Sequence, residues 1–267
     1  MAPLDGHKAI VTGGGSGIGA ATCRLFVEQG ASVAVLDRDA DAAARVADEV
    51  GGVAIACDVG DPAAVTAAVA HAAGALGGLT DLVNNAGVGR SKPLHTYTDS
   101  EWRLITSVNL DGTFHCMRAA LPLLLEAGGG SIVNNASLNA LRPLPGEAPY
   151  SAAKAAVVNL TMTAAVEYAP TVRVNCVSPG LIDTALTAMV TANPDWLAGA
   201  VSGTPAGRIG TADEVAAVIA FLCSDAAAYV TGQNVVVDGG AFLPSLQADA
   251  LLRRIMAGNA NPRSSST

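Results

Sequence analysis

Tyr150 and Lys154 lie four residues apart in the stretch YSAAK, residues 150–154. On a helix this spacing places two side chains one turn apart on the same face. A phenol with a pKa of about 10 is a poor proton carrier at neutral pH, but a neighbouring ammonium favours the phenolate. The pair could therefore exchange a proton with a substrate oxygen. The same spacing also occurs in ordinary amphipathic helices, so the surrounding chain must decide.

Short β-branched runs alternate along the chain with longer Ala-rich stretches, which is typical of βα repeats. The mostly apolar runs suit strands that are buried on both faces of a parallel sheet. We expect strands at 8–12, 32–37, 53–58, 81–85, 131–137, 172–178 and 234–238. We expect helices at 17–29, 39–50, 61–75, about 99–127, 150–168 and 212–224. The pattern predicts an α/β fold: one doubly wound parallel sheet of about seven strands, the Rossmann fold, with helices on both faces.

The length of 267 residues suits one large domain. We expect a dinucleotide-binding and catalytic domain over residues 1–243. Within it, the long connection 180–211 is predicted to be a substrate-binding lid, because connections of this length are usually functional. Residues 244–267 are expected to form a C-terminal extension, since they end in NANPRSSST, the composition of a frayed terminus.

Composition excludes several classes of protein. A net charge of −8 without a Lys/Arg cluster argues against nucleic-acid binding. No run of 18 or more apolar residues suggests a membrane span, and the first residues do not resemble a secretory signal. The five cysteines are odd in number and lie in apolar surroundings, which indicates buried thiols in a reducing compartment. We therefore expect a cytoplasmic protein, and no metal site, since His95 has no second ligand at a suitable spacing.

A glycine-rich stretch, TGGGSGIG at 12–19, joins the first expected strand to the first expected helix. Glycines let the backbone turn tightly and approach a pyrophosphate, while the helix N-terminus supplies free N–H groups. The alternative is a plain glycine turn. We predict that this loop binds a dinucleotide through Gly13, Ser16, Gly17, Ile18 and Gly19.

The ends of the next strands carry further candidates for the nucleotide. Asp37 ends the second strand, where a carboxylate can bind both ribose hydroxyls and repel a 2′-phosphate, which favours NAD over NADP. Arg38 could soften that preference, because guanidinium pairs well with phosphate. Asp58, followed by Val59, could either cap a turn or approach the adenine amine.

The fourth expected strand ends in NNAG, residues 84–87. Asparagine and glycine can leave a strand in unusual backbone conformations. We expect Asn85, Ala86 and Gly87 to line the crevice over the cofactor.

Four motifs share one register on this βα pattern: TGGGSGIG, NNAG, YSAAK, and SPG at 178–180. In their order and spacing, over roughly residues 5–243, the chain resembles the short-chain dehydrogenase/reductase family. The resemblance implies four catalytic residues, namely Asn109, Ser137, Tyr150 and Lys154. Tyr150 is then the general acid/base, Ser137 binds the substrate oxygen, and Lys154 also binds the nicotinamide ribose. Asn109 is implied to hold a water that links Lys154 to solvent.

The resemblance also implies contacts beyond the sixth strand. Pro179 and Gly180 turn the chain, Ile182 contacts the carboxamide through its backbone, and Thr184 offers a nearby hydroxyl. Tyr150 and Lys154 count among the cofactor contacts as well. A homotetramer is implied, with a dimer as the next possibility. The helices expected at about 99–127 and 150–168 support it, because both are apolar on more than one face.

Several of these residues also have simpler interpretations. Ser137 could cap the end of a strand, and Asn109 could be a hydrogen-bonding residue inside a helix. Asn139 could face the substrate or cap a turn. Arg90 and Lys92 could attract an anionic substrate at the cleft rim, although solvated loop charges are more common.

Three functions remain at this point. The first is an NAD-dependent oxidoreductase that interconverts a secondary alcohol and its ketone. The second is an NADPH-dependent reductase of 3-oxoacyl chains on acyl carrier protein or CoA, against which Asp37 argues. The third, a nucleotide-binding regulator without catalysis, is disfavoured because all four catalytic positions are filled. The sequence does not identify the substrate, since the fold and cofactor site serve many chemistries.

Overall fold

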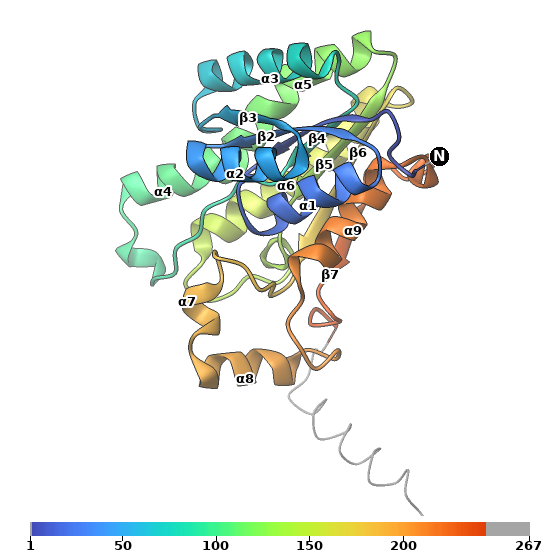
Figure 1. Ribbon diagram of the computed structural model, residues 1–267. Helices are drawn as coiled ribbons and strands as arrows, with labels where there is room; N and C mark the ends of the chain where they lie inside the picture. The colour runs from blue at the N-terminus through green and yellow to red at the C-terminus, as the bar shows by residue number, and fades with distance from the viewer. Residues whose placement is uncertain (1, 244–267) are drawn as a thin grey trace, which may run out of the picture.

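A computed structural model describes residues 2–243 (Figure 1). Seven parallel strands form one sheet in the order β3-β2-β1-β4-β5-β6-β7. The strands are β1 (Lys8–Thr12), β2 (Ser32–Asp37), β3 (Val53–Ala56), β4 (Asp81–Asn84), β5 (Gly130–Asn135), β6 (Val172–Pro179) and β7 (Asn234–Val237). The predicted doubly wound sheet is confirmed. The tail predicted for 244–267 lies outside the described residues.

Helices cover both faces of the sheet, and the alternation of side chains along each strand explains why. In β2, Val33 and Val35 pack in the hydrophobic cluster on one face of the sheet, while Ala34 and Leu36 pack in the cluster on the other face. Full burial of each such Val or Leu contributes about 1.5–3 kcal/mol. The helices are α1 (Gly17–Glu28), α2 (Ala40–Val50), α3 (Pro62–Leu76), α4 (Asp99–Thr106), α5 (Gly112–Glu126), α6 (Ala148–Tyr168), α7 (Ala188–Thr191), α8 (Pro194–Gly203) and α9 (Ala212–Cys223).

The helix predicted over about 99–127 is interrupted in its middle. A π-helical turn, Ser107–Asp111, separates α4 from α5. Asn109 explains the interruption, because its side-chain Nδ2 donates to the carbonyl of Ile105 at 2.8 Å, the group that the backbone N–H of the same residue would take in a regular α-helix. The helical periodicity on either side of this turn is otherwise as predicted.

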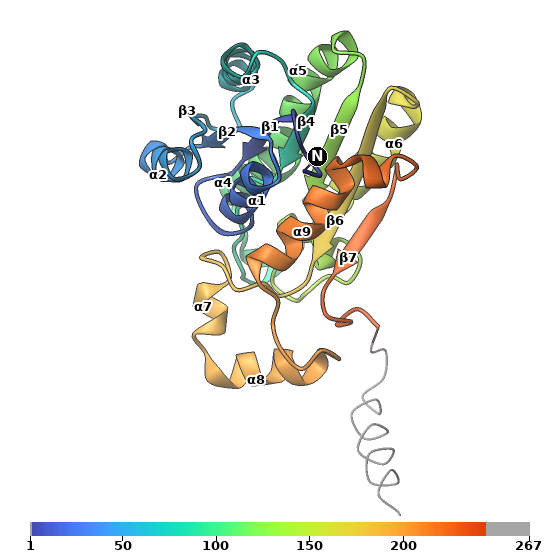
Figure 2. The ribbon, with the colours of Figure 1, turned by 45° about the vertical axis from the view of Figure 1, so that its right-hand side comes forward.

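The strand order opens a crevice at one edge of the sheet. From β1 the chain moves outward through β2 to β3, then crosses back to β4 on the other side of β1. Connections that leave β1 and β4 in opposite directions leave a space at the carboxyl ends of these strands. Figure 2 shows α7 and α8 beyond that edge, apart from the helices that flank the sheet. No helix within residues 2–243 is long and apolar enough to cross a membrane.

A buried carboxylate accepts hydrogen bonds from several segments at the amino ends of the strands. Asp81, at the start of β4, is 1% exposed. Its Oδ2 contacts Nδ1 of His7 at 2.7 Å and accepts from Oγ1 of Thr80 at 2.6 Å. Its Oδ1 accepts from the hydroxyl of Ser131 at 2.6 Å. The hydrogen bond to Asp81 raises the pKa of His7 above its ordinary value, against the lowering effect of burial.

We predict that this pair makes stability depend on pH. Because the folded-state pKa of His7 is raised, the stabilisation is fully present below the unfolded-state pKa, about 6.5, and is lost as pH rises through the folded-state pKa. His7→Gln keeps a donor but cannot carry charge. It should cost about 1–2 kcal/mol of unfolding free energy in acid and less in alkali, by urea titration at pH 5.5 and 9. An equal loss at both pH values would contradict this.

Candidate active site

The glycine loop leaves the N-terminus of α1 open to an anion. Gly13 has φ +60°, and a Cβ there would lie 2.8 Å from Cα of Ala86, so no side chain fits. Ser16 precedes α1 without a side-chain cap, and the first turn holds no acidic residue. The unpaired N–H groups and the dipole of the helix therefore face the cleft. Gly19 does not line this cleft; its missing Cβ lets α1 pack against the Gly13 carbonyl, 2.1 Å from where that atom would be.

Asp37 is fixed at the edge of the same cleft. Its Oδ2 accepts from the backbone N–H of Gly15 at 3.0 Å, and its Oδ1 accepts from that of Asp39 at 3.0 Å. Each oxygen keeps a lone pair for a further donor. Arg38 lines the cleft as well and makes no ion pair within the described residues. The geometry suits a ribose with free hydroxyls.

Asp58 and Val59 lie on the wall of the cleft beyond β3. Of the two interpretations of Asp58, the structure shows the turn, because its Oδ1 accepts from the N–H of Gly60 at 2.9 Å. Val59 packs against Gly112, where a Cβ would lie 2.6 Å from Cγ2 of the valine.

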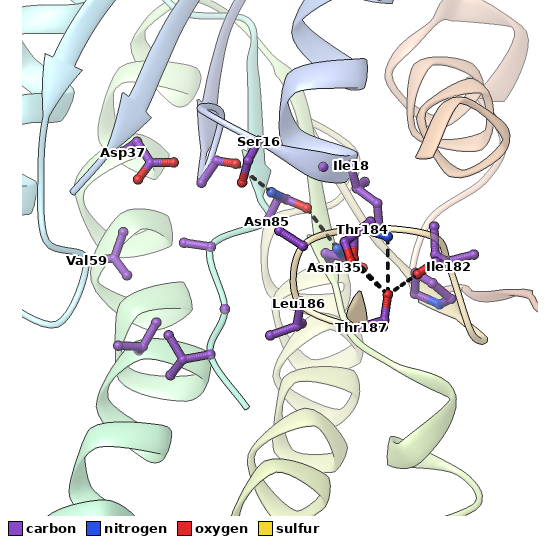
Figure 3. Close-up of a pocket in the computed structure, with 18 of the residues that line it drawn as sticks. Ser16, Ile18, Asp37, Val59, Asn85, Asn135, Ile182, Thr184, Leu186 and Thr187 are labelled. Atoms are coloured by element: carbon purple, nitrogen blue, oxygen red, sulfur yellow. Dashed lines mark hydrogen bonds between the residues drawn. The ribbon is translucent and has the colours of Figure 1, made fainter. Parts of the chain in front are cut away.

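A chain of amides connects the glycine loop to β5, as Figure 3 shows. Nδ2 of Asn85 donates to the carbonyls of Thr12 and Gly13, both at 3.1 Å. Its Oδ1 accepts from Nδ2 of Asn135 at 2.9 Å. The predicted contact Asn85 thus also holds the loop in place. Asn135 was not selected from the sequence, because its position is that of an ordinary strand residue.

Lys154 is buried beneath the cleft, with 3% of its surface exposed. Its Nζ donates to the backbone carbonyl of Asn135 at 2.6 Å and lies 5.7 Å from the ring centroid of Tyr150. Burial lowers the pKa of Lys154 to about 8. A neutral amine is therefore accessible at this position near physiological pH.

Burial also dominates the titration of Tyr150. It raises the pKa of the phenol to about 12, with a further small rise from the carboxylate of Glu147, while the Ser137 hydroxyl acts in the lowering direction. The lowering of the Tyr150 pKa that we expected from Lys154 is therefore outweighed in the protein without its cofactor. The reason is that both groups are taken out of water, which favours the neutral form of each.

Ser137 lies two residues beyond β5, so the strand ends earlier than predicted. It caps a short 3₁₀ turn, Leu138–Ala140, and its Oγ accepts from the N–H of Asn139 at 3.1 Å. Because that bond uses a lone pair, the hydroxyl proton remains free to be donated. Asn139 is buried in this turn and donates from Nδ2 to Glu147.

Asn109 is fully buried in the π-helical turn. Its Nδ2 donates to the carbonyls of Ile105 and Val88, at 2.8 and 2.7 Å, and its Oδ1 has no partner. A Cβ on Gly87 would lie 2.9 Å from that Oδ1 and 3.7 Å from Nζ of Lys154. The two polar groups thus face one small space that exists because residue 87 is glycine, and a water there would join them.

Beyond β6, one hydroxyl organises the turn that the resemblance assigns to the nicotinamide. Oγ1 of Thr187 donates to the carbonyls of Ile182 and Thr184, at 2.5 and 3.0 Å, and accepts from the N–H of Thr184 at 3.2 Å (Figure 3). Ile182 also forms a backbone bridge to Gly210, which closes the base of the 180–211 connection. Thr187 was not selected from the sequence, where its only signal is that it is a second threonine, three residues after Thr184, in IDTALT.

Most of the predicted nucleotide contacts share this one cleft. They are Gly13, Ser16, Gly17, Ile18, Asp37, Arg38, Asp58, Val59, Asn85, Ala86, Gly87, Tyr150, Lys154, Pro179, Gly180, Ile182 and Thr184. The rim residues Arg90 and Lys92 both pair with Glu101. Their charges are therefore engaged within the protein rather than directed at a ligand.

A doubly wound sheet, an open helix N-terminus and a buried lysine beside a half-buried tyrosine at the switch point define a dinucleotide-dependent oxidoreductase. Comparison with known proteins agrees. A family model described as enoyl-(acyl carrier protein) reductase matches residues 13–241. The chain belongs to the short-chain dehydrogenase/reductase family, whose members bind NAD or NADP.

Two curated relatives and one solved structure illustrate the likeness. The cis-4-hydroxycyclohexanecarboxylate dehydrogenase of Sinomonas cyclohexanicum is 44% identical over 87% of this chain and 95% of the relative. The cyclohexanol dehydrogenase of Acinetobacter sp. is 42% identical over 88% and 95%. The 3-ketoacyl-(acyl-carrier-protein) reductase from Brucella melitensis, complexed with NADH, is 36% identical, with a TM-score of 0.85 over 90% of this chain and 100% of that one.

We predict that Thr187→Val weakens cofactor binding at the nicotinamide end alone. The valine cannot hold the three backbone groups of the turn, so NADH affinity should fall about five- to tenfold. ADP-ribose, which lacks the nicotinamide, should bind as before; both affinities can be measured by fluorescence and calorimetry. Thr187→Ser should restore NADH binding. The matched control is Thr191→Val, because that hydroxyl bonds only the Ala188 carbonyl. Equal losses for both ligands would refute the assignment.

Proposed function

We propose that this protein is an NAD-dependent oxidoreductase that interconverts a secondary alcohol and its ketone, with Tyr150 as the general acid/base. One observation carries the proposal. Tyr150 and Lys154 line the cleft that also holds the glycine loop, the Ser137 hydroxyl contacts Tyr150, and Asn109 lies beneath the cleft, where its Oδ1 and Nζ of Lys154 face the same space at Gly87. Family membership supports the same reaction class, since the named relatives are dehydrogenases that act on CH–OH groups.

The side chains divide the work of proton transfer. Ser137 donates its free hydroxyl proton to the substrate oxygen and holds it beside Tyr150. Tyr150 takes the alcohol proton during oxidation and returns it during reduction. Lys154 stabilises the phenolate, and a water between Lys154 and Asn109 passes the proton toward solvent. The bound cofactor supplies the hydride acceptor, and its oxidised ring adds a positive charge that favours the phenolate.

Asp37 supports NAD as the cofactor. Its carboxylate is immobilised by two backbone N–H groups at the cleft edge, where it would accept from ribose hydroxyls and repel a 2′-phosphate. Arg38, which has no acidic partner in the described residues, is the feature that would admit NADP. We infer that the carboxylate prevails, because it lies directly against the glycine loop.

We infer that the substrate is a neutral secondary alcohol on a six-membered ring, or the matching ketone. The two curated relatives described above are named for secondary alcohols on a six-membered ring, of which cyclohexanol is neutral and cis-4-hydroxycyclohexanecarboxylate also carries a carboxylate. In this chain, the pairing of Arg90 and Lys92 with Glu101 leaves no obvious cation for a substrate carboxylate at that side of the rim. Reduction of carrier-bound 3-oxoacyl chains remains the second candidate, favoured by the likeness to the Brucella structure.

We further propose that the protein is a cytoplasmic homotetramer, with a dimer as the next possibility. The free, buried state of all five cysteines suits a reducing compartment. Large apolar side chains lie exposed along α4, α5 and α6, and they would be covered in an assembly. They are Trp102, Leu104, Phe114, Met162 and Val166.

Tyr150→Phe tests the chemistry. Removing the hydroxyl abolishes proton exchange with the substrate oxygen, so cyclohexanol oxidation should fall about 10³-fold, followed by NADH absorbance. NADH binding should stay within about twofold of the wild type, since the ring remains. Tyr168→Phe, on the same helix, is the matched control and should retain full turnover. Full turnover in Tyr150→Phe would overturn the catalytic assignment.

Cofactor choice is tested by titrating NADH against NADPH. We expect NADH to bind at least about tenfold more tightly, because Asp37 faces the 2′ position. Asp37→Ser should reduce the ratio of NADH affinity to NADPH affinity, because NADPH would bind more tightly. Asp41→Ser, which makes the same charge change in the first turn of α2 without touching the glycine loop, should leave the ratio alone. Tighter NADPH binding by the wild type would refute the role of Asp37.

A further inference from the structure

Glu147 occupies the position immediately before α6, yet it does not cap the helix. The short side chains of Ser, Thr, Asp or Asn at this position accept from the N–H groups of the first turn. The Glu147 side chain makes no such bond. Its carboxylate is bound instead by side chains from other segments.

Three segments meet at this carboxylate. Oε1 of Glu147 accepts from the hydroxyl of Ser91 at 3.0 Å, and Oε2 accepts from Nδ2 of Asn139. The N–H of Asn139 in turn donates to Oγ of Ser137 at 3.1 Å. A continuous chain of hydrogen bonds therefore runs from the proposed substrate-binding hydroxyl to the start of the helix that carries Tyr150, three residues after Glu147.

The loop at the cleft rim, residues 89–97 (the rim loop), is also bound at the start of α6. The carbonyl of Gly146, next to Glu147, accepts from the N–H of Lys92 at 3.0 Å and from the phenol of Tyr97 at 2.8 Å. Together with the Ser91 bond, these contacts fix the loop against the N-terminus of α6. A shift of the Ser137 turn relative to Tyr150 would have to break this junction.

The charge of Glu147 has no cationic partner among the described ion pairs. Both of its donors are neutral, and the nearby cations Arg90 and Lys92 are bound to Glu101. An unpaired, half-buried carboxylate acts on neighbouring acids by like-charge repulsion. In agreement, Glu147 contributes to raising the pKa of Tyr150 and of Tyr97.

We propose that Glu147 is a positioning residue for the reaction: its carboxylate joins the Ser137 turn to the Tyr150 helix, and its charge opposes ionisation of Tyr150. The inference rests on the proposed function. Glu147, immediately before α6, and Lys154, on α6, are the charged groups next to Tyr150 along the chain, while the Leu138–Ala140 turn and the residue before it contribute the neutral Asn139 and Ser137. Glu147 and Lys154 thus act on Tyr150 in opposite directions.

Glu147→Gln separates the charge from the hydrogen bonds, because the amide oxygen still accepts. Alcohol oxidation needs the phenolate, so the acidic limb of kcat/KM for cyclohexanol reports the titration of Tyr150. Removing the charge should move the midpoint of that limb to lower pH by about 0.5–1 unit. Glu147→Asp keeps the charge and should leave the midpoint near that of the wild type.

Asn139→Leu breaks the tether and leaves the charge in place. Misplacing Ser137 relative to Tyr150 should lower kcat about tenfold with little change in the pH midpoint. Glu126→Gln, at the end of α5 on the opposite edge of the sheet, makes the same charge change as Glu147→Gln and should alter neither quantity. NADH affinity, measured separately, should be unchanged in every variant.

The outcomes distinguish this inference from the proposed function. An unchanged or higher pH midpoint in Glu147→Gln, or an equal shift in Glu126→Gln, overturns the electrostatic role. Wild-type kcat in Asn139→Leu overturns the tether. If Tyr150→Phe itself keeps full turnover, the catalytic role of Tyr150 fails, and this inference falls with it.

Discussion

The burial of the Lys154 amine is the constraint on which the rest of the site depends. A buried ammonium is costly unless it is hydrogen-bonded, and the carbonyl of Asn135 supplies that bond at 2.6 Å. The bond requires β5 to end where it does, and the space beside the amine requires glycine at position 87. The π-helical turn then brings the free Oδ1 of Asn109 to the same space. Sheet, loop and helix are thus fitted around one nitrogen atom.

Desolvation is the main influence on the protonation states of Tyr150 and Lys154. Burial moves the pKa values of Tyr150 and Lys154 in opposite directions, to about 12 and about 8, and so favours the uncharged form of both. Charges placed at the edge of the site then adjust this balance. Glu147 is one such charge and disfavours the phenolate, whereas a cationic nicotinamide would favour it. Their sum sets the pH at which Tyr150 changes from proton donor to proton acceptor.

The fold and the core of the site follow from local patterns in the sequence. Apolar runs in alternation with Ala-rich stretches predicted all seven strands, and four motifs in register selected Tyr150, Lys154, Ser137 and Asn109. The π-helical turn was not predicted, because hydrophobic periodicity continues through it and only the side chain of Asn109 breaks the pattern. Asn135, Thr187 and Glu147 were missed for a related reason. Their hydrogen bonds go mostly to backbone groups or to segments far along the chain, which residue spacing does not reveal.

The 180–211 connection differs from the rim loop in how it is attached. Its base is closed by the bridge between Ile182 and Gly210 and by the bond from the N–H of Ala206 to the carbonyl of Gly239. Between these points α7 and α8 stand away from the sheet (Figure 1). Ala185, Leu186 and Thr187, just before α7, line the cleft. Residue changes in this part of the connection can therefore alter the cleft wall without changing Lys154 or the glycine loop. In evolutionary terms, substitutions in the 180–211 connection can change which substrate fits the cleft. The residues proposed for proton transfer, Tyr150 and Lys154, can stay the same.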